Sequence, residues 1–269
     1  MVKPAELSGA KPRLYHALSS YYSMIARLAL IEGGMACESV VIDIHLKMVQ
    51  QQPDYVRLNP NMTVPTLVMP DRNLDDSRDI AEYALGVSEA TLDGDTRTWL
   101  DLHYGYPVEQ LTFGKLLASN PLARIVIPKR LEAVRRRLLK RAAQNPDLAK
   151  VYEARAEAFA ARIRAFDPAA VVRLAETRRA EAIGFMDRLE QTLGDGRAVL
   201  VPPAYGVADV VWTVFLARME FVGMGAEIRK RPALARYWRA MQARPSFAPA
   251  DIWTKVHVFR LIGGMLGIG

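Results

Sequence analysis

Residues 61–68 carry the pattern with the clearest chemical meaning in this sequence. They read NMTVPTLV, so a proline stands directly before an apolar run that is typical of a strand. Because proline has no N–H to give to a sheet ladder, such a strand lies at a sheet edge or begins at a special turn. A cis bond between Val64 and Pro65 would leave that edge free for a bound peptide. Because only about 5 to 6% of X-Pro bonds in folded proteins are cis, this pattern alone supports a cis Pro65 weakly, and the context of the surrounding sequence decides.

Metal and disulfide chemistry are disfavoured by the cysteine and histidine content. Cys37 is the single cysteine, so the chain forms no internal disulfide, and this fits a reducing compartment. The four histidines, at positions 16, 45, 103 and 257, show no metal-ligand spacing. We expect neither a structural nor a catalytic metal.

The positive charge of the chain is confined to one segment. The net charge is +7, yet residues 124–179 alone contain 15 Lys and Arg against six Asp and Glu. This segment is mostly Ala, Leu, Arg and Glu at helical spacing, without the interleaved aromatic residues of a nucleic-acid site. A solvated helical face is favoured over nucleic-acid binding. Anionic substrates or lipid head groups remain alternative uses of the same charge.

The composition is that of a folded protein with more than one domain. The chain has 269 residues, of which 51% are hydrophobic and 24% charged, close to the averages for globular proteins. No uncharged apolar run is long enough for a membrane span, and the first residues do not resemble a secretion signal. We expect a cytoplasmic protein whose apolar C-terminal tail packs on the protein or on a partner.

Hydrophobic spacing predicts two domains of different class, α/β and then all-α. A small α/β domain at residues 1–87 contains a βαβ unit, and an all-helical domain at 93–269 carries a basic insertion around 117–168. Gly33 and Gly34 end the first helix, and Pro128 and Pro168 are among the prolines that mark joints between later helices. The predicted strands are 13–16, 39–44 and 66–69; the predicted helices are 23–31, 53–58, 96–117, 130–143, 148–166, 168–193, 207–221 and 232–244.

The order βαβ, then VPTL, then Asp76-Ser77 at a helix start resembles the glutathione-binding domain of the glutathione S-transferases. The resemblance extends to the helical half, where Asp209 matches an aspartate that reaches back to a helix start, although Gly206 replaces the usual Ser or Thr. Within the superfamily the sequence is most similar to bacterial tetrachlorohydroquinone dehalogenases. This resemblance implies a thioredoxin-like N-terminal domain followed by a helical domain, with glutathione as co-substrate.

The resemblance locates the chemistry in the turn Ser19-Ser20-Tyr21-Tyr22-Ser23. There a hydroxyl and the positive end of the following helix would stabilise the glutathione thiolate. Ser20 aligns with the serine of the dehalogenases and is favoured as the donor over a role as helix cap only, since the two roles are compatible at a helix start. Tyr22 is the rival donor, since other branches of the superfamily use a tyrosine. Tyr22 also occupies the position of the dehalogenase cysteine, so the resemblance implies direct substitution without the redox step.

The same resemblance implies the ligand contacts. The backbone of Val64, before cis Pro65, would pair with the cysteinyl part of glutathione, and Asp76 and Ser77 would hold the γ-glutamyl end, unless they only cap the helix. The resemblance also places the contact with the glycyl carboxylate in the segment that contains Lys47, Gln51 and Arg57, without assigning it to any of the three.

The second substrate would lie against the aromatic and polar run that contains His103, Tyr104 and Tyr106. These three side chains could equally be interdomain packing.

Two functions stay open. The first is a glutathione transferase that attacks an aromatic or benzylic electrophile, by dehalogenation or by aryl ether cleavage. The second is a catalytically silent binding subunit with the same fold, for example as half of a heterodimer. In either case the superfamily implies a dimer, formed with a second copy or with a sister chain.

Overall fold

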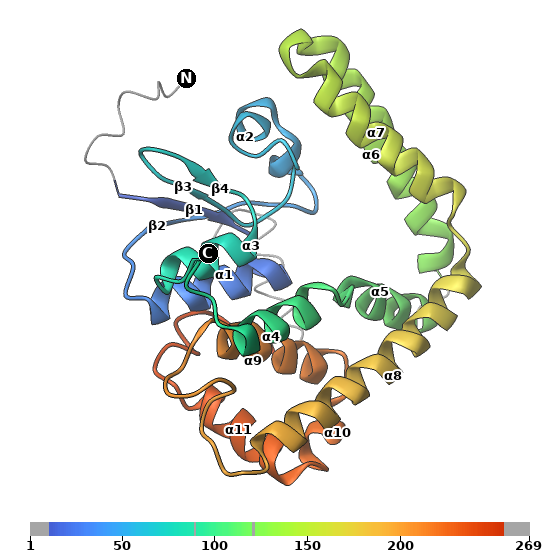
Figure 1. The fold of residues 1–269 in the computed structure, drawn as a ribbon. Coiled ribbons are helices and arrows are strands. Elements are labelled where there is room, and N and C mark those ends of the chain that lie inside the picture. The colour runs from blue at the N-terminus through green and yellow to red at the C-terminus, as the bar shows by residue number, and fades with distance from the viewer. Residues whose placement is uncertain (1–10, 89, 120–121, 256–269) are drawn as a thin grey trace. The chain divides into compact units, whose positions relative to one another are not determined.

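The computed structural model describes residues 11–88, 90–119 and 122–255, which form two compact units (Figure 1). The first unit comprises the described residues up to Gln50, Asn61–Tyr106 and those from Phe185 onward, and the second comprises Gln51–Pro60 and Pro107–Gly184. The predicted domain boundary between residues 87 and 93 stays a prediction. The apolar C-terminal tail and His257 lie outside the described residues.

A four-stranded mixed sheet with the order β2-β1-β3-β4 forms one layer of the first unit. β1 pairs in parallel with β2 and antiparallel with β3, and β3 pairs antiparallel with β4. Leu14 of β1 lies opposite Leu67 of β3, and Leu67 opposite Leu74 of β4. The strands are β1 (Arg13–His16), β2 (Glu38–Val41), β3 (Thr66–Val68) and β4 (Asn73–Leu74).

Helices α1 (Tyr21–Glu32) and α3 (Ser77–Ala84) cover one face of this sheet (Figure 1). The core between the layers contains Leu14, Ala26, Leu67 and Ile80, each at most 2% exposed. Cys37 packs against this cluster, and burial raises the pKa of its thiol. The cysteine is therefore a partly buried residue beside the core with a weakly acidic thiol.

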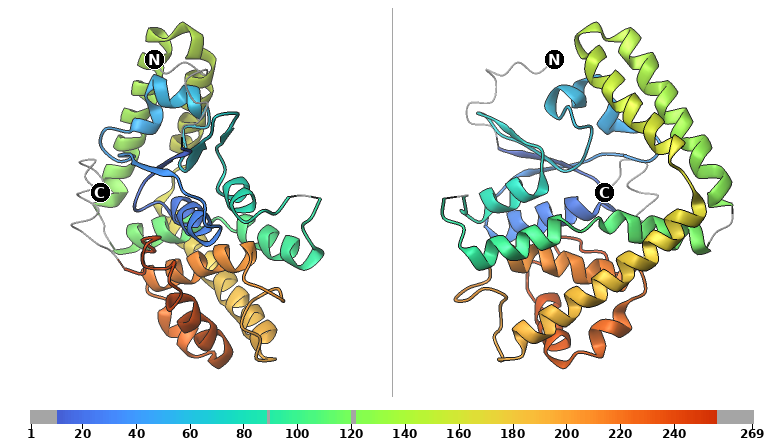
Figure 2. Two further views of the ribbon diagram at one scale, coloured as in Figure 1. Left: turned by 90° about the vertical axis from the view of Figure 1, so that its left-hand side faces the viewer. Right: turned by 45° about the vertical axis from the view of Figure 1, so that its right-hand side comes forward.

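The remaining helices of the first unit are α4 (Gly94–Tyr104), the end of α8 (Pro168–Leu193), α9 (Val207–Phe221), α10 (Gly225–Arg229) and α11 (Pro232–Gln242). α9 is buried along almost its whole length and contacts both α1 and α4 (Figure 2). The Asp209 carboxylate accepts the Gly206 N–H at 3.0 Å, which confirms the predicted helix start. Asp209 also accepts bonds from the Leu200 N–H and the Tyr237 hydroxyl.

The second unit contains α2 (Pro53–Leu58), α5 (Val108–Ser119), α6 (Ala123–Gln144), α7 (Ala149–Arg164) and the first part of α8. α6 and α7 lie side by side as a long hairpin, joined by the turn that begins at Pro146 (Figure 2). The Tyr152 hydroxyl, on α7, donates to the Gln51 carbonyl at 2.9 Å. The basic residues predicted to form a helical face lie mostly on this hairpin.

Three sequence predictions of elements are wrong in detail. The helix predicted over 96–117 is two helices, because Gly105 ends α4 and Pro107 precedes α5. Pro128 lies inside α6 rather than at a joint, where its missing N–H removes one hydrogen bond of the second turn. The second strand ends at Val41, since the following residues turn around the Asp43 carboxylate, which accepts three backbone N–H groups.

Candidate functional site

The first wall of the site is the start of α1. Ser20 is the N-cap, and its Oγ accepts the Ser23 N–H at 3.3 Å. This bond satisfies one of the unpaired N–H groups of the first turn. Tyr22 is the second residue of the helix, one residue after the buried Tyr21. The Ser19 hydroxyl lies 3.1 Å from Nε2 of His45, in the loop after β2.

The second wall is the turn into β3. The peptide bond between Val64 and Pro65 is cis, as the sequence predicts. Met62, two residues earlier, adopts a left-handed backbone with φ of 54°. The Asn61 amide then donates to the Asp75 carboxylate at 2.9 Å, which links this turn to the residue before the N-cap of α3.

The third wall is the N-terminus of α3. Asp76 is the N-cap, and its Oδ1 accepts the Arg78 N–H at 2.7 Å. Ser77 is the first helical residue and is 3% exposed. Its Oγ lies 3.3 Å from the hydroxyl of Tyr104 at the end of α4. A helix N-terminus with a serine in its first turn favours a carboxylate ligand, because the backbone N–H groups and the helix dipole attract negative charge.

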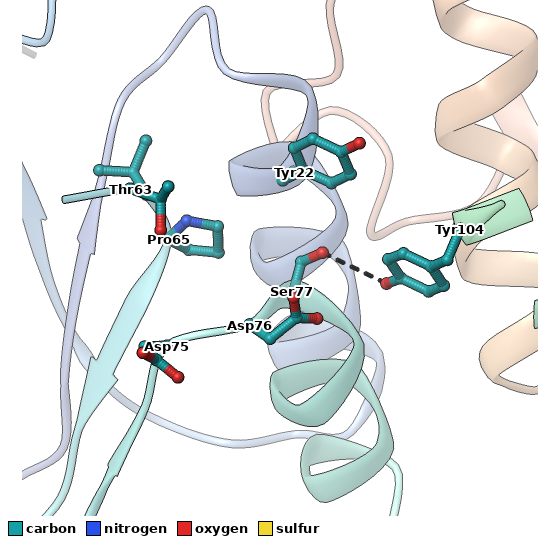
Figure 3. Close-up of a pocket in the computed structure, with 8 residues that line it drawn as sticks. Tyr22, Thr63, Pro65, Asp75, Asp76, Ser77 and Tyr104 are labelled. Atoms are coloured by element: carbon teal, nitrogen blue, oxygen red, sulfur yellow. Dashed lines mark hydrogen bonds between the residues drawn. The ribbon is translucent and has the colours of Figure 1, made fainter. Parts of the chain in front are cut away.

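These walls enclose a cavity of about 340 Å³ (Figure 3). Its volume lies within the usual range for small-molecule sites. Figure 3 shows the Tyr22 ring extending from α1 above the pair formed by Ser77 and Tyr104. The lining residues are Tyr22, Thr63, Val64, Pro65, Asp75, Asp76, Ser77 and Tyr104.

The cavity brings together six of the nine residues predicted from the sequence as site residues. They come from α1, the β3 turn, the start of α3 and the end of α4. Thr63 and Asp75 also line the cavity, and sequence reasoning did not assign either of them a role. Each is the sequence neighbour of a predicted ligand residue, which was the one available signal.

Three predicted site residues lie elsewhere. Ser20 does not line the cavity and caps α1 instead. His103 is 3% exposed, and its Nε2 lies 2.6 Å from the Tyr21 hydroxyl. Tyr106 is 4% exposed and packs edge-on against Phe185 and Phe215. None of Lys47, Gln51 and Arg57 lines the cavity either.

Burial sets the protonation states of the aromatic groups around the cavity. It raises the pKa of Tyr104 above its ordinary value of 10.0, and the bond to Ser77 only partly offsets this effect. It lowers the pKa of His103 to about 3. Tyr104 is therefore a neutral phenol and His103 a neutral imidazole near pH 7.

Metal binding has no support in the described part of the chain, where no three His, Cys, Asp or Glu side chains are grouped to hold an ion. In the same residues, no helix is long and apolar enough to cross a membrane. The polar groups of the cavity suit an organic ligand with carboxylate and amine groups, since hydroxyls, a helix N-terminus and two carboxylates line it.

Comparisons with known proteins identify the family. A model of the glutathione S-transferase N-terminal domain matches residues 14–88. The chain is also 30% identical to a tetrachloro-p-hydroquinone reductive dehalogenase of Sphingobium chlorophenolicum, over 89% of this chain and 95% of the relative. This chain belongs to the glutathione S-transferase superfamily. A glutathione S-transferase of Arabidopsis thaliana is 27% identical over 87% of each chain.

Solved structures of glutathione S-transferases have the same fold. A poplar glutathione transferase superposes with a TM-score of 0.59 at 17% identity, covering 90% of this chain and 96% of its own. A β-etherase from Sphingobium sp. gives a TM-score of 0.58 at 18% identity, with 89% and 98% covered. In this glutathione S-transferase the cavity therefore lies in the thioredoxin-like part of the fold, next to the end of α4.

Proposed function

We propose that the chain is a glutathione transferase that binds glutathione in the cavity between α1, the β3 turn and α3. The observation that carries the proposal is that Tyr22, Val64 and Ser77 line one cavity although they are far apart in sequence. In the proposed complex the Val64 backbone pairs with the cysteinyl part of glutathione, as an added strand does. Ser77 and the N-terminus of α3 hold the γ-glutamyl carboxylate.

The amine of the γ-glutamyl end has a matching acidic environment. Asp75 and Asp76 both line the cavity beside Ser77, so a positive ammonium group would face two carboxylates. The ammonium group of the ligand would thus face the carboxylates, and the carboxylate on the same carbon would face the positive N-terminus of α3, at one end of the cavity. This arrangement supports an amino acid terminus as the ligand group there.

Tyr22 is the proposed donor that stabilises the thiolate. The Tyr22 ring lines the cavity, whereas the Ser20 Oγ accepts the Ser23 N–H and lies outside the lining. A hydrogen bond to a charged group contributes about 1.5 to 3 kcal/mol, which corresponds to a pKa lowered by about one to two units. A larger thiolate fraction at neutral pH gives a faster nucleophile.

The proposed reaction is non-redox substitution on an aromatic or benzylic electrophile. The sulfur of glutathione forms a bond to carbon while halide or an aryl oxide leaves with the bonding electron pair, and the thiol proton goes to solvent. A redox route through a cysteine has no support in the cavity, because Cys37 packs against the core cluster and tyrosine stands at position 22. The name of the 30% identical relative, tetrachloro-p-hydroquinone reductive dehalogenase, is that of an enzyme acting on a chlorinated aromatic compound, which supports an aromatic electrophile as substrate.

Two measurements test the proposal. Calorimetric titration gives the affinity for glutathione, and the turnover of a chloronitroaromatic test electrophile gives the transferase activity. Tyr22→Phe should raise the pKa of bound glutathione by about one to two units and slow turnover near neutral pH by about ten- to a hundredfold. Tyr83→Phe, which removes an exposed hydroxyl on α3, serves as the matched control and should change neither.

The variants also separate the alternatives. If Ser20→Ala rather than Tyr22→Phe shifts the thiolate pKa, Ser20 is the donor. Tight glutathione binding without turnover of any electrophile would favour the silent binding subunit. Release of glutathione disulfide by Tyr22→Cys would reveal a latent reductive route.

Self-association is the second part of the proposal. The chain should form a dimer with a second copy or with a sister chain, as the resemblance to the superfamily implies. Sedimentation should then give about twice the chain mass of 30.0 kDa. A single species of the chain mass at micromolar concentration would contradict this assembly.

A further inference from the structure

Two pairs of adjacent residues face each other between α1 and α4. Tyr21 and Tyr22 follow one another on α1, and His103 and Tyr104 follow one another on α4. Successive residues of an α-helix point about 100° apart, because the helix has 3.6 residues per turn. One member of each pair is accordingly buried, while the other lines the cavity.

The buried members are joined by a short hydrogen bond. The Tyr21 hydroxyl and Nε2 of His103 are 2.6 Å apart, and their rings stack at 5.7 Å with an angle of 18°. The Arg218 guanidinium, on α9, lies over the Tyr21 ring, 5.3 Å from its centre. His103 Nδ1 is buried with no hydrogen-bond partner among the described residues, so the bond to Tyr21 is the hydrogen bond that orients this imidazole, which also packs against the Trp212 ring.

The cavity members depend on the buried members for their places. Tyr22 packs edge-on against Tyr21 with ring centres 5.2 Å apart, and Tyr104 packs edge-on against His103 at 4.7 Å. A shift of either buried ring therefore moves the cavity tyrosine beside it. The chain of contacts runs from Tyr22 through the two buried rings to Tyr104, whose hydroxyl lies 3.3 Å from Ser77 Oγ.

We propose that the hydrogen bond between Tyr21 and His103 sets the spacing of Tyr22 and Tyr104 across the glutathione cavity. The inference rests on the proposed function, since the two cavity hydroxyls are the groups that would meet the thiolate and the γ-glutamyl end. Tyr21 and His103 are positioning residues and touch no ligand. A displacement of about 1 Å in a catalytic group can reduce a rate by about a hundredfold, so a buried bond that sets this distance has a measurable effect.

Three variants separate hydrogen bonding from packing. Tyr21→Phe removes one hydroxyl and keeps the ring, while His103→Leu removes the hydrogen-bonding partner of that hydroxyl. His103→Gln places an amide where Nε2 lies and should restore the bond to Tyr21. The matched control is Tyr152→Phe in the second unit, which also loses a buried hydroxyl that forms a hydrogen bond, here with Gln51.

The readouts are the pH profile of the bound thiolate and the dissociation constant of glutathione. For Tyr21→Phe and His103→Leu the pH profile of the thiolate should move to higher pH, and the dissociation constant of glutathione should rise about threefold to tenfold. In His103→Gln the pH profile and the dissociation constant should both lie close to the wild-type values. Tyr152→Phe should lower the melting temperature without moving the pH profile. An equal effect of Tyr152→Phe, or no rescue by His103→Gln, would overturn the proposal.

A measurement without glutathione separates this inference from the proposed function. Fluorotyrosine is incorporated throughout, and the fluorine resonances of positions 22 and 104 are assigned with Tyr22→Phe and Tyr104→Phe. Tyr21→Phe should shift both resonances in the ligand-free protein, and unchanged resonances would overturn the inference. If the resonances shift while the wild-type protein fails to bind glutathione, the positioning contact stands and the proposed function is refuted.

Discussion

The hydroxyl of Ser77, at the first residue of α3, lies 3.3 Å from the hydroxyl of Tyr104, at the last residue of α4. The sequence assigned these two residues to different ligands, with Ser77 for glutathione and Tyr104 for the second substrate. Their contact instead favours a shared role at the γ-glutamyl end of the cavity. Because burial raises the pKa of Tyr104, its phenol stays protonated and can donate a hydrogen bond.

Tyr104→Phe should therefore weaken glutathione binding. Loss of one donor next to a bound carboxylate corresponds to a dissociation constant about threefold to tenfold higher, measured by calorimetric titration. Ser77→Ala and the double variant complete a cycle, in which the two effects should not add because the hydroxyls contact each other. If Tyr104→Phe raises only the KM of the electrophile, Tyr104 belongs to the second-substrate site as the sequence suggested.

Elements bounded by proline or glycine were predictable from the sequence. Pro168 begins α8 and Gly33 ends α1 where the local pattern indicated, because proline lacks a backbone N–H and glycine favours helix ends. The rule fails at Pro128, which lies inside α6. The two-residue strand β4 was not predicted, since two residues are too few to show alternation. Helix α10 was not predicted either, because its five residues are too few to show the 3.6-residue period of a helix.

The candidate site was predictable where its signal is local. The Val64-Pro65 step and the start of α3 are visible in short stretches of sequence, and both line the cavity. The contact of Ser77 with Tyr104 joins residues 27 positions apart, so no local pattern could indicate it. The choice between Ser20 and Tyr22 depends on side-chain direction at the start of α1, which spacing alone does not fix.

Gly114 should be intolerant of alanine because of close packing between α5 and α8. A Cβ at this position would collide with the Ala175 side chain and come within 3.2 Å of the Val171 carbonyl oxygen. Gly114→Ala should therefore lower the free energy of unfolding by about 1 to 3 kcal/mol, measured by urea denaturation.

Gly184 on α8 is the matched control, because a Cβ there meets no atom within 4 Å. Gly184→Ala should raise the free energy of unfolding by about 0.5 to 1 kcal/mol, since alanine favours the helix interior over glycine. Equal effects of the two substitutions would show that α5 and α8 do not pack closely at Gly114.

Replacement of Asp209 should be among the most destabilising changes of a polar residue in the first unit. Its carboxylate is fully buried and accepts three hydrogen bonds, from Leu200, Gly206 and Tyr237. Asp209→Ala should cost about 3 kcal/mol or more of the free energy of unfolding, because buried donors lose their acceptor. Asp93→Ala, which removes the exposed N-cap of α4, should cost only about 1 kcal/mol. Chemical denaturation of both variants checks the difference, and a cost at Asp209 no larger than at Asp93 would contradict it.

Glu32, at the end of α1, should make the stability of the protein depend on pH in acid. Burial alone would raise the pKa of Glu32, but hydrogen bonds from Arg244 and Ser246 and the Arg244 charge outweigh it and leave the pKa below its ordinary value of 4.5. Arg244 donates two bonds to this carboxylate, from Nε at 2.7 Å and from a terminal nitrogen at 2.6 Å. A lowered pKa in the folded protein means that the stabilisation is complete above the ordinary value and is lost as the pH falls through the folded value.

Glu32→Gln should therefore lower the free energy of unfolding at pH 7 by about 1 to 2 kcal/mol, because one partner of a partly buried ion pair becomes neutral. As the pH falls below 4.5, the unfolded chain takes up a proton at Glu32 before the folded protein does, so the difference between the two proteins should shrink until the folded carboxyl is also protonated. Urea denaturation at a series of pH values from 7 down to about 3 measures this difference directly. Raising the salt concentration at pH 7 should reduce it only in part, since the Glu32 side chain is 10% exposed and therefore weakly screened. A difference that stays constant down to the lowest pH would show that the charge of Glu32 contributes nothing, and that the glutamine variant acts through packing alone.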